Sequence, residues 1–269
     1  MNKLNNGEYF GNHNQELRFN DIIITDTEYT HEKVDWHYHE NSYFTYLIQG
    51  KLFEESKKKS DYLTSGSLLF HNWQDAHYNI KPPEYTRGFH IELNSEWFKN
   101  NDMCSFNFEG STNIKNPQIK TLINKVFLET KINDEQSQIS IELLMLEIFS
   151  KIQGRKNQSK KQPKWVNTLR ELITDEPNNN FSLSNLSKVL NIHSAHLSRD
   201  FSKYFGTTLG EYIRLLKINK ATLLIAKNEF SLTEICYQCG FYDQSHFISN
   251  FKRIYNTTPS VFLTQISKR

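Results

Sequence analysis

Three histidines in the first third of the chain have the residue type and the spacing for metal or ligand binding. His37 and His39 are separated by one residue, and His77 follows further along the chain. Side chains two residues apart on a strand point to the same face, so this pair can converge with His77 inside a β-structure. Three imidazoles can hold a divalent metal ion and leave coordination positions open. The alternatives are a pocket for a small molecule and simple packing within a core.

A second pair of potential ligands, Cys236 and Cys239, lies near the other end of the chain. A structural zinc ion needs four ligands, which usually come from two such pairs, and the third cysteine, Cys104, stands apart in the sequence. We therefore expect Cys236 and Cys239 to be buried packing residues. Three cysteines are too few for a disulfide scaffold and are typical of a reducing compartment.

Charge divides the chain into two unlike halves. The 269 residues carry a formal net charge of +2, with 32 Lys and Arg against 30 Asp and Glu. Residues 1–152 hold 15 basic and 22 acidic residues, a net charge of −7, whereas residues 153–269 hold 17 and 8, a net charge of +9. Such a basic half favours a polyanionic partner on the C-terminal side only. No apolar run approaches the roughly 18 residues of a membrane-spanning helix, so we expect no membrane partner.

The hydrophobic pattern changes from strands to helices along the chain. Residues 1–110 contain short apolar runs separated by Gly and Pro, which predict a β-sandwich or small barrel. Residues 111–152 contain two apolar stripes at helical spacing, which predict a helical pair that covers the edge of the barrel or forms a dimer interface. Residues 153–164 are basic and lack apolar side chains, as in a solvated linker. Residues 165–269 have helical patterns, so the predicted fold class is α+β with two domains.

A repeat in the C-terminal half indicates its architecture. Residues 181–186 and 230–235 each place an aromatic residue before a Ser suited to N-capping and an apolar pair at helical spacing. A tight turn and a second, amphipathic helix are expected to follow each of these short helices. Phe201 and Phe251 occupy equivalent positions in the two amphipathic helices. A short capped helix, a turn and a second helix make a helix-turn-helix unit, so the sequence predicts two such units.

These residues resemble the double helix-turn-helix domain of the AraC/XylS transcription regulators. The resemblance extends from Phe181 to Phe262 and is carried by His196–Arg199 with Phe201, Ser231–Ile235, Cys239–Phe247, Phe251–Arg253 and Thr258–Phe262. The sequence departs from the family pattern at Asn185, His193, Lys217 and Asn256. These departures affect the fine geometry of the expected helices and leave the expected fold unchanged. The resemblance implies a DNA-binding regulator of transcription.

Helical phase identifies the side chains that are expected to face DNA. The faces opposite the apolar stripes of the two second helices carry Ala195, His196, Ser198, Arg199, Ser202 and Lys203, and Gln244, Ser245, Ile248, Ser249, Lys252 and Arg253. In the major groove Arg pairs with guanine and Gln with adenine. Phase and family resemblance together therefore make Arg199, Gln244 and Ser245 the candidates for base reading. The three other Lys and Arg side chains of this set are expected to contact phosphates.

The histidine segment resembles the motifs of the cupins, and AraC-like regulators commonly carry a cupin-type effector domain. His37, His39 and Tyr43 have the spacing of the first cupin motif, with Tyr43 in place of its usual Glu, and His77 stands at the histidine of the second. The resemblance implies a cupin-like β-barrel in which His37, His39, Tyr43 and His77 bind an effector. Because the acidic ligand is missing, we expect no metal ion, no cofactor and no enzyme activity. The alternative is a metal-dependent cupin enzyme fused to a DNA-binding domain.

The predicted organisation has four segments. They are a cupin-like effector-sensing domain at residues 1–110, a helical pair at 111–152 that mediates dimerisation, a basic linker at 153–164 and an AraC-type DNA-binding domain at 165–269. The expected partners are double-stranded DNA, a small-molecule effector, a second copy of the chain and RNA polymerase. Residues 1–11 are polar and lack the apolar segment of a secretory signal. With the low cysteine content, this predicts a cytoplasmic location.

Overall fold

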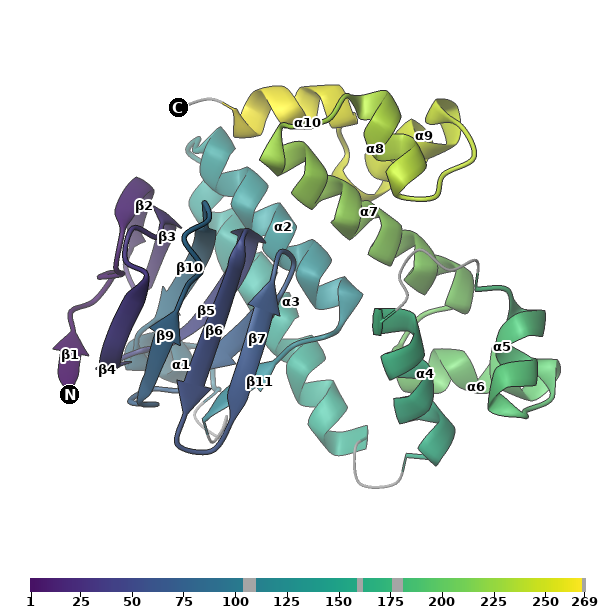
Figure 1. Cartoon of the computed structure of the whole chain (residues 1–269), viewed down its shortest axis with the longest axis horizontal. Helices are drawn as coiled ribbons and strands as arrows, with labels where there is room; N and C mark the ends of the chain where they lie inside the picture. Colours follow the sequence, from purple (N-terminus) through teal and green to yellow (C-terminus); the bar gives the residue numbers. More distant parts are fainter. Residues whose placement is uncertain (104–109, 159–161, 176–180, 268–269) are drawn as a thin grey trace. The chain divides into compact units, whose positions relative to one another are not determined.

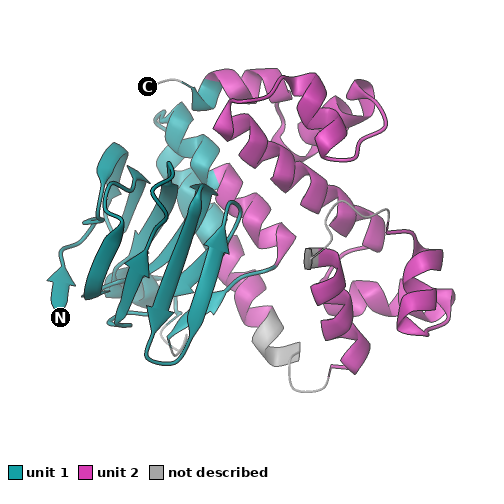
Figure 2. Ribbon diagram, viewed as in Figure 1, with its two compact units in different colours: residues 1–115, 126–146, 265–269 teal, residues 116–125, 147–264 magenta. Residues whose placement is uncertain are grey.

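The computed structural model describes residues 1–103, 110–158, 162–175 and 181–267, and its contacts divide the chain into two compact units (Figure 2). Unit 1 consists of residues 1–115, 126–146 and 265–269. Unit 2 consists of residues 116–125 and 147–264. Unit 1 holds the β-strands and unit 2 holds the repeated short helices of the C-terminal half.

Unit 1 is built on two β-sheets that face each other (Figure 1). The five-stranded sheet has the order β1-β4-β9-β6-β7, and the six-stranded sheet has the order β11-β8-β5-β10-β3-β2. The first sheet contains β1 (Asn2–Leu4), β4 (Lys33–His39), β9 (His77–Ile80), β6 (Lys51–Ser56) and β7 (Ser60–Thr64). The second contains β11 (Ser111–Asn113), β8 (Leu68–His71), β5 (Ser42–Gln49), β10 (Arg87–Leu93), β3 (Ile22–Glu28) and β2 (Asn12–Phe19).

The two sheets form an open sandwich, whereas the cupin resemblance implied a closed barrel. Within the described residues, no strand pairs with members of both sheets, so each sheet keeps two free edges. A barrel needs an unbroken circle of paired strands, but none of the edge strands β1, β7, β11 and β2 pairs with the facing sheet within the described residues. The predicted α+β fold class is confirmed, and the sandwich, the other architecture that the strand pattern allowed, replaces the barrel.

Alternating side chains fill the space between the sheets. Leu47 and Leu69 from the six-stranded sheet pack with Leu52 and Leu63 from the five-stranded sheet, and all four are at most 4% exposed. Successive residues of a strand face opposite sides, so the same strands also present side chains to the outer face of each sheet. β5 is buried over nearly its whole length because both of its faces are covered.

The C-terminal part of helix α2 (Pro117–Ile132) covers the outer face of the six-stranded sheet. The ring of Phe127 meets that of Phe89 edge to face, with 5.2 Å between centroids. Beside them Asp26, 2% exposed, accepts hydrogen bonds from Arg87 at 2.7 and 2.6 Å and from Lys131 at 2.7 Å. One buried carboxylate thus joins β3 and β10 to α2.

Helix α3 (Ser137–Gln158) extends beyond the end of the predicted helical pair. It includes the first residues of the segment 153–164 that the sequence predicts to be a linker, and α4 (Lys164–Asp175) begins at the end of that segment. Residues 159–161 of the predicted linker lie outside the described residues. The domain boundaries given above stay predictions. In the part of the chain that the structure describes, no helix has the length and apolar character needed to cross a membrane.

Unit 2 contains the two repeated helix pairs on either side of one long helix. After α4 follow α5 (Leu183–Leu190), α6 (Ser194–Phe205), α7 (Leu209–Lys227), α8 (Leu232–Gln238), α9 (Gln244–Tyr255) and α10 (Pro259–Ile266). A further helix, α1 (Ser95–Asn100), lies in unit 1 after β10. Helix α7 has 19 residues and is therefore about 28 Å long. Figure 1 shows α7 between the pair α5–α6 and the pair α8–α9.

Capping residues and turns fix the two helix pairs as the sequence predicts. Ser182 accepts a hydrogen bond from the backbone of α5, and Ser231 forms a capping box with Glu234 at the start of α8. The turn after α5 contains Asn191 with φ of 51°, and the turn after α8 contains Gly240 with φ of 70°. Positive φ is tolerated best by Gly and Asn. The same device therefore reverses the chain in both pairs.

Aromatic rings form the cores of the two pairs, stacked in the first and edge to face in the second. In the first pair Phe201 and Phe205 are stacked with 4.1 Å between ring centroids. In the second pair Phe251 contacts Phe247 and Phe262, with centroids 5.9 and 5.3 Å apart. These rings are at most 2% exposed. Cys236 and Cys239 are also buried beside this second core, as expected for packing residues.

Candidate DNA-binding face and effector pocket

The second helix of each pair has one buried and one exposed face. In α6 the buried face is formed by Leu197, Phe201 and Phe205, and in α9 it includes Phe247 and Phe251. Every side chain that the sequence predicts to face DNA is exposed: Ala195, His196, Ser198, Arg199, Ser202, Lys203, Gln244, Ser245, Ile248, Ser249, Lys252 and Arg253. The structure thus places the twelve residues on the outer faces of two equivalent helices.

On α6 the guanidinium group of Arg199 is held by its neighbours without being buried. It lies 2.8 Å from Nδ1 of His196, one helical turn earlier, and 3.6 Å from a carboxylate oxygen of Asp200. The Arg199 side chain is nevertheless 70% exposed. The Arg199 guanidinium is therefore accessible to a ligand at this face of α6.

On α9 two predicted DNA contacts already have partners within the domain. The side-chain amide of Gln244 donates to the hydroxyl of Thr233 on α8 at 2.7 Å. The guanidinium of Arg253 lies 2.8 Å from the carboxylate of Glu211, which also pairs with Arg214 at 2.7 Å. Lys252 is exposed next to Arg253. Arg253 must therefore leave or share Glu211 before it can reach a phosphate.

Tyr242 is an exposed candidate that the sequence reasoning did not single out. It is 90% exposed and directly precedes Asp243, which caps α9. Its neighbour Phe241 is 4% exposed. A buried aromatic residue followed by an exposed one, just before the second helix of the pair, was the signal available in the sequence. Tyr242 can stack or hydrogen bond at the DNA surface.

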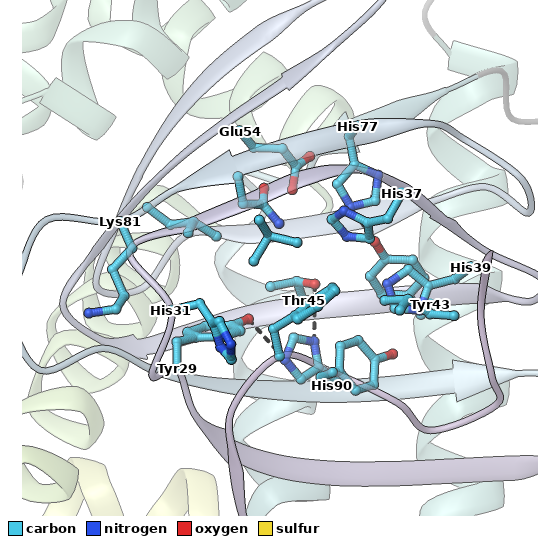
Figure 3. A pocket seen from close by; sticks show the side chains of 16 residues that line it. Tyr29, His31, His37, His39, Tyr43, Thr45, Glu54, His77, Lys81 and His90 are labelled. Carbon is cyan, nitrogen blue, oxygen red and sulfur yellow. Dashed lines mark hydrogen bonds between the residues drawn. The ribbon is translucent and has the colours of Figure 1, made fainter. Parts of the chain in front are cut away.

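A small pocket with both polar and apolar lining residues lies between the two sheets of unit 1 (Figure 3). His37 and His39 on β4 and His77 on β9 reach it from the five-stranded sheet, while Tyr43 on β5 reaches it from the six-stranded sheet. The structure therefore brings together all four predicted effector-binding residues. The free space between the lining side chains is about 30 Å³. This is far below the roughly 300 Å³ or more of pockets that enclose drug-sized ligands.

Hydrogen bonds orient the imidazoles of the pocket. Nδ1 of His37 lies 2.9 Å from the carbonyl oxygen of Asp35, and Nδ1 of His77 lies 2.8 Å from that of Asp75. A carbonyl oxygen only accepts, so each Nδ1 carries the proton and each Nε2 is left as an acceptor. The hydroxyl of Tyr43 donates to Nε2 of His77 at 3.1 Å.

Burial keeps the pocket histidines neutral. Desolvation lowers the pKa of His77 to about 3 and that of His90 to about 3, and it lowers the pKa values of His39 and His71 well below the usual range. Desolvation, with the nearby charges of Asp61 and Asp75, raises the pKa of Glu54 to about 8. Neutral imidazoles with an inward lone pair are the form that binds metal ions or accepts hydrogen bonds.

The pocket also contains polar residues that the sequence reasoning missed. Glu54 on β6 and His90 on β10 line it, and His71 on β8 lies next to it, stacked on the ring of Tyr43; all three are at most 4% exposed. In Figure 3 Glu54, His77 and His37 lie along one side of the pocket, whereas His90 lies on the other side with Thr45 and Tyr29, to which it is hydrogen bonded. Only the alternation of inward and outward positions along β6 and β8 could have indicated Glu54 and His71.

Comparison with known proteins supports the interpretation of the C-terminal half. A family model described as a helix-turn-helix domain matches residues 186–265. The transcriptional activator RhaS of an Escherichia coli O139:H28 strain is 26% identical over 147 residues, which is 53% of this chain and 52% of RhaS. The activator RhaR of Mannheimia succiniciproducens is 22% identical over 155 residues, 56% of each protein. The chain thus spans about half the length of these curated relatives.

Solved structures give weaker similarities. ToxT from Vibrio cholerae aligns with 92% of this chain and 100% of its own, at 16% identity and a TM-score of 0.38. The C-terminal domain of the response regulator YesN from Fusobacterium nucleatum aligns with 36% of this chain and 98% of its own, at 35% identity and a TM-score of 0.33.

The capped helix, tight turn and exposed second helix, together with the family match, define a helix-turn-helix DNA-binding domain in the C-terminal half. Two such units joined by one long helix, with the similarity to RhaS and RhaR, agree with the AraC/XylS type of DNA-binding domain that the sequence resembles.

Proposed function

We propose that this chain is a transcription regulator that binds double-stranded DNA with both of its helix-turn-helix units and responds to an effector bound in the sandwich of unit 1. The observation that carries the proposal is the equivalence of α6 and α9. Each helix exposes polar and basic side chains on one side, and its apolar side fills the core of its helix pair. The net charge of +9 on residues 153–269 supports a polyanionic partner. A cytoplasmic location and contact with RNA polymerase belong to the same proposal.

The exposed faces of α6 and α9 would make two kinds of DNA contact, to base edges and to phosphates. Arg199 on α6, with Gln244 and Ser245 on α9, would read base edges in the major groove. The exposed Lys203 and Lys252 would contact phosphates and set the position of the domain on the duplex. Two recognition helices on one domain suit neighbouring turns of the major groove, about 34 Å apart on one side of the DNA.

Replacing Arg199 by alanine tests the base-reading role. On a duplex selected for tight binding, we expect Arg199→Ala to weaken binding by about 1 to 3 kcal/mol, because one bidentate contact to a guanine is lost. The same change should leave binding to unrelated DNA nearly unchanged. Fluorescence anisotropy with both duplexes at one fixed salt concentration measures the two affinities.

Lys227→Ala is the matched control for this experiment. Lys227 is exposed at the end of α7, where it pairs with Glu229, and belongs to neither α6 nor α9. It should leave both affinities close to those of the unmodified protein. Equal losses on the selected and the unrelated duplex for Arg199→Ala would contradict the base-reading role.

The pocket of unit 1 supports a binding role for the sandwich in preference to catalysis. The relatives named above are transcriptional regulators, and the pocket of about 30 Å³ has room for an ion or one small group. His37, His39, Tyr43 and His77 would form the effector site. Effector binding would shift an existing equilibrium between arrangements of the DNA-binding domains.

An exposed apolar stripe on α3 supports dimerisation through the segment 111–152. Ile139 and Leu143 are 63% and 62% exposed and lie one helical turn apart, on one face of the helix. We expect Leu143→Glu to convert the dimer to a monomer in sedimentation velocity, because the substitution would bury an unpaired charge in the dimer interface. Val189→Glu, at an equally exposed apolar position on α5, should leave the dimer intact. A monomeric unmodified protein at micromolar concentration would refute this interface.

A further inference from the structure

The interior of the sandwich contains a second group of metal-ligating side chains besides the three histidines found in the sequence. Within the described residues, Glu54, His71 and His77 each offer one ligand atom, and these atoms all lie within 4.8 Å of one another. His37, His39 and His77 satisfy the same condition. The two groups share His77, but only the group with Glu54 contains a carboxylate and draws on both sheets.

The second group is contributed by three different strands. Glu54 and His77 lie on β6 and β9, which are neighbours in the five-stranded sheet. His71 lies on β8 in the facing sheet, opposite Tyr43 of β5 in the strand register, and its ring stacks on that of Tyr43 with 4.3 Å between centroids. An ion held by this group would therefore connect the two sheets.

The side chain of His71 is unsatisfied in a way that points to a ligand. It is 0% exposed, and neither of its ring nitrogens has a hydrogen-bond partner in the described part of the chain. Its Nε2 lies 3.7 Å from Oε2 of Glu54, too far for a hydrogen bond. Ligand atoms about 2.0 to 2.2 Å from a tetrahedral metal ion are roughly 3.4 Å apart, close to this separation. A buried imidazole without partners costs free energy that a metal ion would recover.

The other two ligands are already oriented for coordination. The carbonyl of Asp75 fixes the proton of His77 on Nδ1 and leaves Nε2 as an acceptor. This contact is the usual outer support of a metal-binding histidine. The hydroxyl of Tyr43 donates to Nε2 of His77 at 3.1 Å and would give way to the ion. With its amide turned so that the nitrogen faces Glu54, the side chain of Asn79 can donate to Oε2 of Glu54 over 3.2 Å and hold the carboxylate in place. The adjoining space of about 30 Å³ can take an ion with one bound water.

We propose that the sandwich binds one divalent transition-metal ion through Glu54, His71 and His77, with His37 and His39 nearby to complete or adjust the coordination. Two imidazoles and a carboxylate suit first-row ions such as Zn²⁺, Fe²⁺ and Co²⁺ and disfavour Mg²⁺ and Ca²⁺, which prefer oxygen ligands. Glu54 thus supplies the acidic ligand that Tyr43 does not. The inference concerns unit 1 alone and does not depend on the proposed DNA binding.

Titration of the untagged full-length protein with Co²⁺ tests the site. After treatment with a chelator, the protein is expected to bind one equivalent of Co²⁺, seen as visible d–d absorption, and Zn²⁺ is expected to displace it. Glu54→Gln and His71→Gln should each weaken Co²⁺ binding roughly 100-fold or more, since loss of a ligand exceeds the 10- to 100-fold effect of losing an outer support. His13→Gln, at an exposed histidine of β2, is the matched control and should bind as the unmodified protein does.

Thermal unfolding of the same proteins separates loss of the site from loss of the fold. Zn²⁺ should raise the midpoint of the unmodified protein and of His13→Gln, but not that of metal-free Glu54→Gln or His71→Gln, which should still unfold cooperatively. Absence of stoichiometric Co²⁺ binding would overturn the proposal. Co²⁺ binding that survives Glu54→Gln and His71→Gln but is lost in His37→Gln and His39→Gln would also overturn it, in favour of the three histidines found in the sequence.

Discussion

Replacing Phe251 by alanine is expected to lower the free energy of unfolding of the second helix pair by about 3 to 5 kcal/mol, because a large cavity would remain in a closely packed core. Phe251 is 0% exposed and contacts Phe247, Tyr255 and Phe262. Phe201→Ala, at the equivalent position of the first pair, should have a similar cost there. Hydrogen exchange resolved to single helices can measure the two losses separately.

The location of the effect distinguishes a local cavity from general destabilisation. Phe251→Ala should increase exchange mainly in α8 and α9, and Phe201→Ala mainly in α5 and α6. Tyr237→Ala is the matched control, because it removes an aromatic ring from α8 whose side chain is 60% exposed. The free energy of unfolding should change by no more than about 0.5 kcal/mol. A cost below about 1 kcal/mol for Phe251→Ala would contradict the core described above.

Replacing Asp26 by asparagine is expected to destabilise unit 1 by about 3 to 5 kcal/mol, because it leaves two cations at a buried site without their counter-charge. Asp26 is 2% exposed, and its partners Arg87 and Lys131 have side chains only 16% and 7% exposed. Chemical denaturation followed by tryptophan fluorescence measures the loss. Asp35→Asn, which breaks an exposed pair with Lys33, is the matched control and should leave the midpoint unchanged.

The contribution of Asp26 should also depend on pH. Burial alone would raise the pKa of this carboxyl, but the hydrogen bonds and charges of Arg87 and Lys131 outweigh burial and hold its pKa below the ordinary value of 3.8. A lowered pKa stabilises the folded state above the unfolded-state value of about 4, and this stability is lost as the pH falls through the folded-state pKa. Asp26→Asn should therefore flatten the stability profile below about pH 4. A profile that still falls as in the unmodified protein would contradict this role.

The C-terminal domain could be predicted from the sequence because its signals are local. Capping residues, turn residues with positive φ and phenylalanines at helical spacing all lie within a few positions of one another, and the structure contains each of them where it was expected. Ser182, Ser231 and Asn191 are examples. The predicted exposure of Arg199 and Gln244 followed from helical phase alone.

The sandwich was harder to predict because its interior depends on which strands become neighbours. Glu54 shares the inward face of β6 with Leu52, but only the pairing of β6 with β9 brings it to His77. His71 comes from the facing sheet, so no spacing along the chain indicates its approach. The closed barrel was inferred from motif resemblance, whereas closure depends on the length and pairing of the edge strands. Local patterns identify strands but not their partners.

The continuation of α3 into residues 153–158 has a simpler origin. The predicted linker was recognised by its charge and its lack of apolar residues, which indicate exposure but not the absence of a helix. Among its first residues, Gln153, Arg155, Lys156 and Gln158 are good helix formers, and Gly154 and Asn157 are poorer ones. A solvated helix therefore fits the same composition as a solvated linker.

Selection of duplexes from a random-sequence library by the untagged full-length protein tests the central claim most directly. If both helix-turn-helix units read DNA, the enriched duplexes will contain two conserved segments whose centres are about 10 base pairs apart, one turn of the double helix. Enrichment of a single segment would mean that only one of α6 and α9 reads bases. No enrichment over the starting library would contradict the proposal that this chain is a sequence-specific regulator.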